Sequence, residues 1–492
     1  MTSTFHGLQT AYKGLMSQQA ALKTTGHNIA NANTEGYTRQ RVNFSASQAY
    51  PSPGKNAPSL PGQLGTGAEV EHIQRVREHF LDAQYRGGSA NVGYWDKKLT
   101  SMERMEGVMN EQSETGALAE AMDEFWGALH DLAVNPNDAS AREITVQRAA
   151  ALTDTYNHMT DSLESIKRGL GEELDASVQS VNGLIAQIHD LNEEVAEIEA
   201  QGQIPNDLYD HRDRLTDELS EYINIEMVHE NPGPHTHPAA EGGISLYVAD
   251  GDGGRLGGED GEAIIQGERG NEGHLALSVE KNTEGSAVTG IAFNDDFELL
   301  GHHHGKIGAL VDSFGYEEEE EGIYPDMLSR LDALMNDFIA DFNAVHHEGV
   351  DLNGDQGLDF FEIDDDGTMS VNPELMADTD RIAAAKSENA GDGSNALELA
   401  NVKDSSVFEP TFRSIIGDMA IEVDEARRMS DSSLVRRDTI DMKRQSVSSV
   451  SLDEEMTNMI QFQHAYNASS RMITVLDEML DQVINQMGIV GR

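Results

Sequence analysis

The residues best suited to chemistry form an acidic segment of twelve residues, Asp351–Glu362. Oxygen-bearing side chains stand at its first, third, fifth, ninth and twelfth positions, and Leu358 fills the eighth, which is the pattern of a calcium-binding loop. Two features favour a structured turn instead. The turn glycine, Gly357, comes one position late, and the residues after Glu362 do not read as an exit helix. We therefore interpret the segment as a structured turn, with calcium binding as the alternative.

Histidines supply a second set of candidate ligands. His302–His304 stand at one edge of a region rich in Gly, Asp and His, and His229, His235 and His237 stand at its other edge. Imidazole nitrogens bind zinc and copper, so the two edges together could form a metal site. A solvated loop is the simpler interpretation. We expect the chain to hold no metal and no other cofactor.

Catalytic sequence patterns are missing from the chain. A metalloprotease helix needs His-Glu-x-x-His, but neither His229 nor His347, each followed by Glu, has the second histidine. The segment Gly305–Ile307 contains the Gly-Lys pair of a phosphate-binding loop without its Ser or Thr. There is no cysteine, which excludes thiol catalysis, disulfides and cysteine metal sites. We expect a protein without enzymatic activity.

Composition excludes further classes of function. The 492 residues include 87 Asp and Glu against 34 Lys and Arg, a net charge of -53 that repels nucleic acid and anionic membranes. No run of 18 apolar residues occurs, so we predict no membrane insertion. Lys is scarce, with 11 residues against 23 Arg, and an acidic surface poor in Lys suits a protein in high salt or at high pH. The alternative is an acidic surface that only limits self-association. The first residues lack a signal-peptide pattern, which favours a cytoplasmic protein or export without a cleaved signal.

The helices that frame these segments lie at the two ends of the chain, and both carry heptad repeats of apolar residues. Each repeat makes one narrow apolar stripe, which needs a partner helix because it is not broad enough to be the core of its own domain. We therefore predict that the ends pair as an axial coiled coil, with each other and with neighbouring copies. The predicted assembly-seam residues are Leu8, Leu15, Leu22 and Ile29 near the start, and Leu452, Met459, Phe462, Tyr466, Ile473, Leu476, Leu480, Val483 and Met487 near the end.

Between the ends the sequence predicts a mainly α fold with inserted β structure. Apolar residues spaced by three and four predict long helices over 139–200 and 324–345. Alternating runs at 244–248 and 275–279 predict strands, and a stretch rich in Pro, Gly and Ser at 50–67 predicts an extended linker. The predicted domains are an axial terminal-helix domain (1–45 with 450–492), a long-helix bundle (46–228 with 320–449, loop-rich over 350–405) and an inserted outer β domain (229–319).

The N-terminal helix ends in a segment that resembles a known signature. Residues 28–40 read NIANANTEGYTRQ, which is similar to the N-terminal signature of bacterial flagellar rod, hook and hook-associated proteins. Further similar stretches lie at 206–215, 343–361, 391–400 and 451–485. The signature residues are Asn28, Asn31, Asn33, Gly36, Tyr37, Arg39 and Gln40, of which the ending from Tyr37 onwards is typical of hook-associated members.

The resemblance implies a structural component of the bacterial flagellum that connects the hook to the filament and is required for filament assembly. Its implied partners are copies of itself in a ring, the hook protein, a second junction protein and the filament. Export is implied to use the flagellar type III apparatus, with a cytoplasmic chaperone on the C-terminal helix, and to place the protein outside the cell. The alternatives are a hook or rod subunit, or a junction protein with an added metal-binding outer domain.

Overall fold

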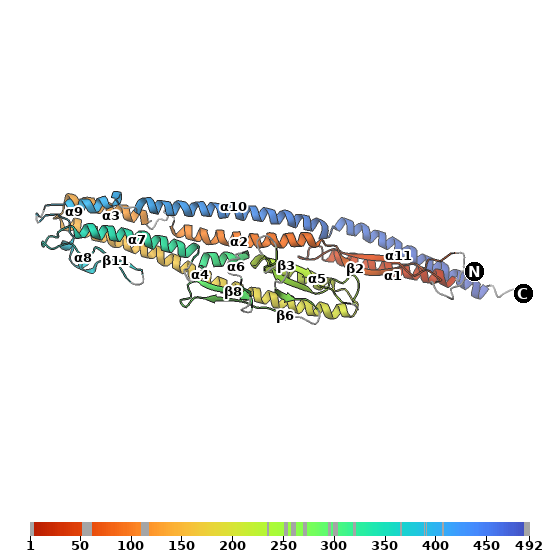
Figure 1. Ribbon diagram of the computed structural model, residues 1–492. Coiled ribbons are helices and arrows are strands. Elements are labelled where there is room, and N and C mark those ends of the chain that lie inside the picture. The colour runs from red at the N-terminus through yellow and green to blue at the C-terminus, as the bar shows by residue number, and fades with distance from the viewer. Residues whose placement is uncertain are drawn as a thin grey trace, which may run out of the picture. The chain divides into compact units, whose positions relative to one another are not determined.

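The computed structural model describes residues 4–51, 62–109, 118–233, 236–249, 254–256, 262–268, 273–293, 297–298, 304–317, 321–364, 367–387, 389, 391–405 and 408–486. The chain divides into two compact units. The terminal unit comprises Met1–Ser89, Val181–Ala276 and Val435–Arg492, and the middle unit comprises Ala90–Ser180 and Leu277–Leu434. Helices dominate and the sheets are small (Figure 1). The prediction of a mainly α fold with inserted β structure is confirmed.

The long helices follow the predictions closely. The helix predicted over 139–200 is α4, which spans the same residues, and the helix predicted over 324–345 is α7. None of the helices in the described ranges combines the length and apolar character needed to cross a membrane. The helices are α1 (Thr4–Ala30), α2 (His79–Met109), α3 (Leu118–Val134), α4 (Ala139–Ala200), α5 (Asn206–Tyr222), α6 (Gly305–Phe314), α7 (Ile323–His347), α8 (Pro373–Ala377), the 3-10 turn η2 (Thr379–Arg381), α9 (Ser394–Ser405), α10 (Phe408–Ser448), α11 (Leu452–Asp481) and the π turn η3 (Gln482–Gln486).

The strands form small antiparallel sheets in both units. In the terminal unit β1 (Gln40–Ala46) pairs with β2 (Ala68–Arg75), and a separate sheet has the order β3 (Ile225–His229), β4 (Ile244–Val248), β5 (Ala263–Gln266), β6 (Gly273–His274). In the middle unit one sheet has the order β7 (Leu277–Lys281), β8 (Val288–Phe293), β9 (Phe297–Glu298), and β10 (Phe361–Ile363) pairs with β11 (Met369–Val371).

Short elements are where the structure departs from the predictions. The extended linker expected over 50–67 is wrong for the described part of that stretch, because Tyr50 and Leu64 pair backbone to backbone and prolong the β1–β2 hairpin. The strand expected at 244–248 is β4, whereas the one expected at 275–279 begins two residues later as β7. The tract expected to be loop-rich contains the helix α9.

The boundary between the units also falls inside the segment expected to form one inserted β domain, 229–319. Its strands up to β6 belong to the terminal unit, and its strands from β7 onwards belong to the middle unit. The proposed division into axial, bundle and outer β domains therefore stays a prediction.

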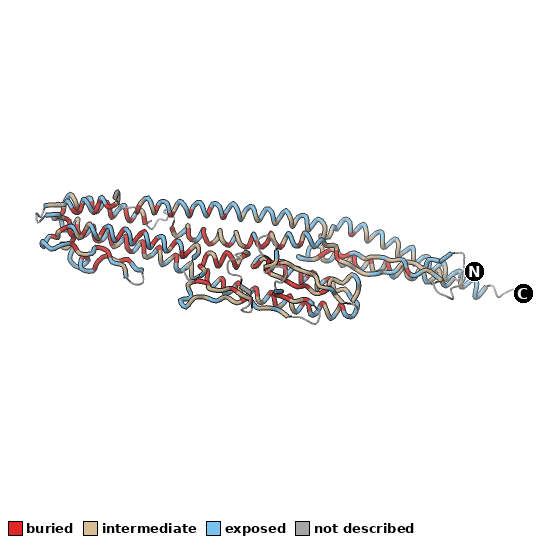
Figure 2. Tube along the Cα trace, in the orientation of Figure 1, coloured by how far each residue is buried: buried red, intermediate tan, exposed pale blue. Residues whose placement is uncertain are grey.

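An aromatic cluster forms the core of the middle unit. Phe125 and Trp126 of α3 meet Phe338 and Phe342 of α7, with ring centroids 5.4 to 6.3 Å apart and tilted or edge-on contacts. Phe361 of β10 joins the same cluster, 5.6 Å from Phe125. All five rings are almost completely buried, and Figure 2 shows the buried residues along α3 and α7. Burial of such large rings is the main stabilising contribution that this unit contains.

The acidic segment interpreted as a turn is hydrogen-bonded within the protein. A carboxylate oxygen of Asp351 accepts two backbone N–H groups, from two and four residues further on, both at 2.8 Å. The carbonyl of Gly357, at the position where a calcium loop supplies its backbone ligand, accepts from His347 at 2.7 Å. The last carboxylate, Glu362, accepts from Asn372 at 2.7 Å. These oxygens therefore take part in hydrogen bonds within the protein.

His346 closes this turn from the end of α7 and is fully buried. Its Nδ1 donates to the carbonyl of Leu358 at 2.6 Å, and its Nε2 accepts from the backbone N–H of Ala383 at 2.9 Å. A proton on Nε2 would break the second bond, so the ring is neutral. Burial lowers the pKa of His346 to about 4.

We expect the middle unit to lose stability as the pH falls from 6.5 to about 4. In this range the unfolded chain binds a proton at His346 and the folded chain does not, which favours unfolding by up to about 1.4 kcal/mol per pH unit. His346→Gln should remove this part of the pH dependence, and His158→Gln, at an exposed site on α4, should leave it unchanged. Hydrogen exchange of α7 amides measures the stability of the unit at each pH. If stability changed equally with pH in the parent, His346→Gln and His158→Gln proteins, His346 would not be the group responsible.

Candidate functional site

The terminal unit is organised around the pairing of α1 with α11. A Cβ added to Gly7 would lie 3.4 Å from the Leu476 side chain, and at the other end of α1 the amide of Asn28 donates to Glu455 at 3.1 Å. In both pairs the residue numbers add to 483, so the helices run antiparallel in one register. Figure 1 shows α1 and α11 side by side. The predicted pairing of the two ends is confirmed within a single chain.

Small residues of α1 lie close to α11. Gly7 recurs seven residues later as Gly14, whose added Cβ would lie 3.4 Å from the hydroxyl oxygen of Ser469. The same register places Ala21, which is 1% exposed, opposite Phe462. The distance between packed helices depends on the side chains at the contact, so this heptad of small residues brings the two backbones close together.

The predicted seam residues lie beside these contacts. Half-buried members are Leu8, Leu15, Leu22 and Ile29 on α1, and Met459, Phe462, Tyr466, Ile473, Leu476 and Leu480 on α11. Leu452 and Val483 are exposed, and Met487 lies outside the described residues. The role of these residues in assembly stays a prediction.

The β1–β2 hairpin packs on the same pair of helices. Ser17 of α1 donates to the carbonyl of Ala68 at 3.0 Å, and the ring of Phe44 lies 6.4 Å from that of Phe462 on α11. The hairpin therefore contacts both helices, and the terminal structure is a three-part assembly of α1, α11 and the hairpin.

Asn28 is the centre of the signature segment. It is 1% exposed, and its amide makes four hydrogen bonds, as many as the group can form. Nδ2 donates to the carbonyl of Gln40 at 2.8 Å and to Glu455, while Oδ1 accepts from the backbone N–H of Gln40 at 3.0 Å and from the hydroxyl of Tyr37 at 2.8 Å. Burial and nearby carboxylates raise the pKa of Tyr37, which keeps this hydroxyl protonated. Asn28 thus holds α1, the following loop and α11 together.

Other signature residues shape the loop between α1 and β1. Asn31 donates to the carbonyl of His27 at 3.1 Å and ends the helix. Gly36 has φ of +77, a left-handed conformation that favours glycine, and its added Cβ would lie 3.3 Å from the side chain of Arg214. Asn33 is exposed. The loop is therefore fixed by backbone geometry as well as by the Asn28 contacts.

The end of the signature attaches to two different helices. Arg39 pairs with Glu455 at 2.9 Å and with Glu454 at 2.8 Å, both on α11. The backbone N–H of Thr38 donates to Asp210 of α5 at 3.0 Å. Because the loop bonds to both helices, the position of α11 and the position of α5 are coupled within the terminal unit.

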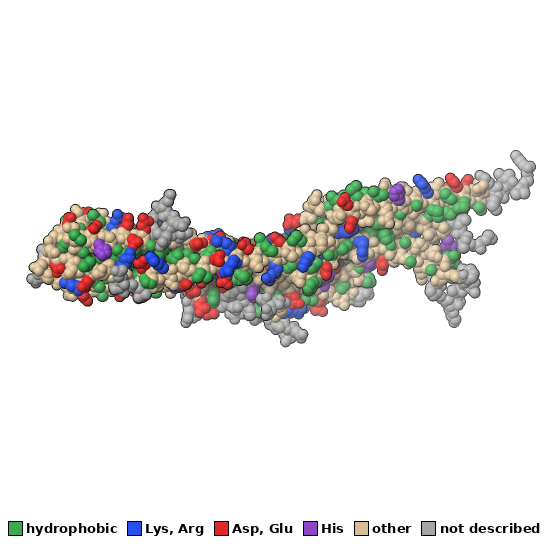
Figure 3. All heavy atoms as spheres, turned by 90° about the horizontal axis from the view of Figure 1, so that it is seen from above, with side chains coloured by type: hydrophobic (Ala, Val, Ile, Leu, Met, Phe, Trp, Pro, Cys, Tyr) green, Lys and Arg blue, Asp and Glu red, His purple; other side chains and the backbone are tan. Residues whose placement is uncertain are grey.

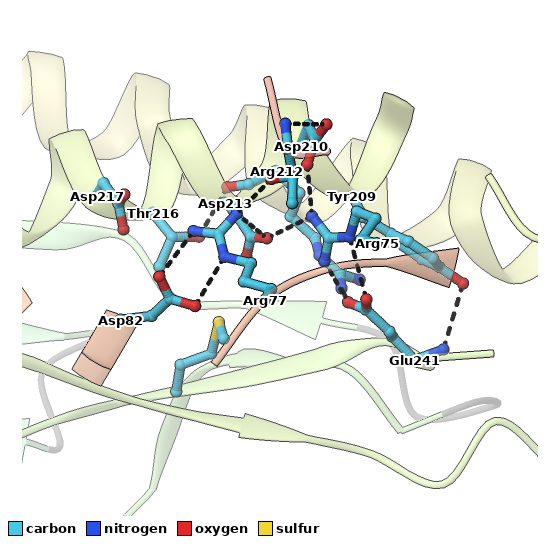
Figure 4. A network of polar contacts seen from close by, with 12 residues as sticks. Arg75, Arg77, Asp82, Tyr209, Asp210, Arg212, Asp213, Thr216, Asp217 and Glu241 are labelled. Carbon is cyan, nitrogen blue, oxygen red and sulfur yellow. Dashed lines mark hydrogen bonds and ion pairs between the residues drawn. The ribbon is translucent and has the colours of Figure 1, made fainter. Parts of the chain in front are cut away.

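A buried network of arginines and carboxylates lies next to this loop (Figure 4). Its centre is Asp213 of α5, whose carboxylate pairs with Arg75 at 2.7 Å, Arg77 at 2.8 Å and Arg86 at 3.4 Å. Asp210, one turn earlier on the same face of α5, pairs with Arg75 at 2.8 Å. All five side chains are largely withdrawn from solvent.

The network extends to the C-terminal part of the terminal unit. Arg77 also pairs with Asp82 of α2 at 2.7 Å, and Arg86 pairs with Asp217 of α5 at 2.8 Å. Asp217 in turn accepts from Arg444 of α10 at 2.5 Å. The charges therefore connect β2, α2, α5 and α10 around the place where the signature loop lies.

Neighbouring charges outweigh the effect of burial at the centre of the network. Burial alone would raise the pKa of Asp213, but Arg77, Arg75 and Arg86 together lower it below its ordinary value. Burial alone would lower the pKa of Arg75, but Asp213 and Glu241 raise it. Pairing makes such charges tolerable in the interior, and the loss of one member leaves its partners uncompensated.

The histidines considered as metal ligands have other neighbours. His229 contacts His79 with ring centroids 4.6 Å apart, and His237 contacts His72 at 5.4 Å. Within the described ranges no group of three or more His, Cys, Asp or Glu residues is placed to hold a metal ion. His235, His302 and His303 lie outside these ranges.

The charge network was not predicted from the sequence, although the sequence contains a signal for it. Asp210, Asp213 and Asp217 recur at spacings of three and four along a predicted helix, which places them on one face. A row of acids is more often a solvated face, so the spacing alone does not indicate burial. The arginines that bury this face, Arg75 and Arg77, lie more than 130 residues earlier.

Family models match the chain in three places. The flagellar hook-associated protein FlgK helical domain matches residues 102–361. The flagella basal body rod protein model matches 8–38, and the flagellar basal body rod FlgEFG protein C-terminal model matches 444–487. The two rod-type matches therefore cover most of α1 with its signature loop and most of α11, the helices that pair in the structure.

Relatives with similar sequences carry one name. Flagellar hook-associated protein 1 of Bacillus subtilis (strain 168) is 39% identical over 522 aligned residues, covering 100% of both chains. The protein of the same name from Escherichia coli (strain K12) is 23% identical, covering 97% of this chain and 99% of its own. The flagellar hook junction protein FlgK from Burkholderia pseudomallei has a solved structure that covers 57% of this chain and 47% of its own, with 19% identity and a TM-score of 0.45.

We expect Asp213→Asn to destabilise the terminal unit by about 3–5 kcal/mol, because the arginines around it would keep buried charges without their central partner. The matched control is Glu69→Gln in the same unit, which removes a more exposed ion pair with Lys13 and should cost about 1 kcal/mol or less. Hydrogen exchange of α5 amides reports the difference. A cost for Asp213→Asn no larger than that for Glu69→Gln would show that the network does not hold this unit together.

Proposed function

We infer the function of this chain from its family, because the chain belongs to the flagellar hook-associated protein 1 family, a structural protein family of the bacterial flagellum. We propose that it is the junction subunit that connects the hook to the filament and that filament assembly requires it. The observation that carries the proposal is the antiparallel pairing of α1 and α11, the two helices that the rod-type family models match.

The charge distribution supports contact between copies through these helices. Glu35 is the first acidic residue of a chain that contains 87, so α1 has none, and residues 456–476 of α11 have none. Since a net charge of -53 makes copies repel one another, surfaces without acidic residues are the ones on which they can meet.

Exposed apolar side chains are present on the same helices. Phe5 and Tyr12 of α1 are 64% and 56% exposed, and Met456 and Met472 of α11 are 57% and 56% exposed. Figure 3 shows hydrophobic side chains along α11 towards the C-terminus, with charged side chains scattered among them. Apolar groups left exposed by the pairing of α1 with α11 are available to neighbouring subunits.

The remaining partners follow from this role. We propose that copies of the chain form a ring that contacts the hook protein on one side and a second junction protein and the filament on the other. Export through the flagellar type III apparatus, with a cytoplasmic chaperone on the C-terminal helix, would place the chain outside the cell. The absence of cysteine suits passage as an unfolded chain.

We expect Leu476→Asp and Leu15→Asp to abolish incorporation into flagella while the middle unit stays folded. Each change places a carboxylate in a half-buried position of the helix pair, at a cost of about 2–4 kcal/mol. Ser451→Asp, at an exposed position just before α11 and outside the acid-free stretch, is the matched control and should still be incorporated. Immunoelectron microscopy and circular dichroism give the two readouts, and normal filaments from Leu476→Asp and Leu15→Asp would contradict the role of the seam.

Deletion of the gene separates the junction role from that of a hook or rod subunit. Cells without the chain should assemble hooks that carry no filament and should shed filament protein into the medium, because the connection between the two is missing. Electron microscopy of the cells and immunoblots of the medium measure these outcomes. Loss of the hook itself would favour the hook or rod alternative.

A further inference from the structure

One polar cluster interrupts the otherwise small and apolar contact between α1 and α11. Asn28 and Glu455 meet in the interface, 1% and 2% exposed, with Asn28 Nδ2 3.1 Å from the Glu455 carboxylate. Arg39 donates to the other carboxylate oxygen of Glu455 at 2.9 Å. The three side chains come from α1, the signature loop and α11, and Glu455 bonds to both of the others.

The rest of the interface discriminates poorly between registers. Gly7, Gly14 and Ala21 are spaced by seven residues, so a shift of one heptad again places a small residue opposite α11. Their counterparts on α11, Phe462 and Leu476 among them, repeat with the same period. After a shift Gly14 would face Phe462 or Leu476 in place of Ser469, so a small residue of α1 still meets the same stripe of α11.

The polar cluster has no such tolerance. A shift of one heptad in one direction would place Asn28 opposite Phe462, and a shift in the other direction would place Glu455 opposite Ala21. Either shift removes a hydrogen-bond partner from a group that is withdrawn from water. Polar groups buried without partners are costly, and a polar residue in a heptad seam is a known way to specify one register.

We propose that Asn28, Glu455 and Arg39 are the register determinant of the terminal helix pair, selecting an α11 helix that presents a hydrogen-bond acceptor at this position. The cluster positions the helices and excludes shifted pairings. This inference rests on the proposed function and deepens it. Its test measures the pairing of the helices and not filament formation, so the register inference and the proposed function can fail independently.

The absence of cysteine makes disulfide trapping a direct test. The observed register is reported by Gly14→Cys with Ser469→Cys, whose side chains would meet. The two shifted registers are reported by Gly14→Cys with Phe462→Cys and by Ala21→Cys with Ser469→Cys. Each pair is placed in the full chain and oxidised as purified protein and, for variants that assemble, in isolated flagella, and linked peptides are identified by mass spectrometry.

In the parent chain only the first pair should cross-link. In the Asn28→Leu, Glu455→Leu double variant the ratio of shifted to observed cross-links should rise by at least about tenfold, because no buried polar group then opposes a shift. Glu454→Leu is the matched control, since Glu454 is the exposed neighbour that also pairs with Arg39, and it should keep the parent pattern.

Two results would overturn the proposal. A double variant that still forms only the first cross-link would show that the connections of the helices set the register without the cluster. The same shift in Glu454→Leu would show that the exposed ion pair sets the register as much as the buried cluster does. Glu455→Gln, which keeps an acceptor for Asn28, should retain the parent pattern.

Discussion

The close antiparallel contact between α1 and α11 is the constraint on which the terminal unit depends. The contact requires small residues such as Gly7 and Gly14 on one helix, and it requires the two ends of the chain to arrive at one place in one register. The signature loop supplies that alignment. It bonds to α11 through Arg39 and to α5 through Thr38. These bonds fix the position of α11 relative to α5 within the terminal unit.

Buried charges make this alignment specific. Arg75 of β2 and Arg86 of α2 both pair with Asp213 of α5, so their charges tie the positions of these three elements to one another. A planar guanidinium suits such multiple pairing better than an ammonium group does, which gives a structural reason for the excess of Arg over Lys. An apolar cluster of the same size could stabilise the unit equally well, but it would tolerate small displacements that a network of directed ion pairs does not.

Periodic elements were predictable from the sequence and contacts between distant segments were not. The long α4 and α7 were predicted within a few residues, because their apolar spacing persists over many turns. The β1–β2 hairpin was not predicted, because its strands pack on α1 and α11 and their own alternation of buried and exposed residues is incomplete. The heptad leucines correctly predicted that the two ends pair. The contacts of Gly7 and Gly14 were not predicted, because a residue without a side chain adds nothing to an apolar repeat.

The distribution of charge adds a constraint on how copies can meet. Several arginines of the terminal unit are buried together with acidic partners, so the net charge of -53 is carried mainly by the outer surfaces. Repulsion between copies is then strongest on those outer surfaces and weakest along α1 and the acid-free part of α11. Electrostatic repulsion therefore favours orientations in which two approaching copies face each other with these helices. Apolar contacts between the helices can then form at short range.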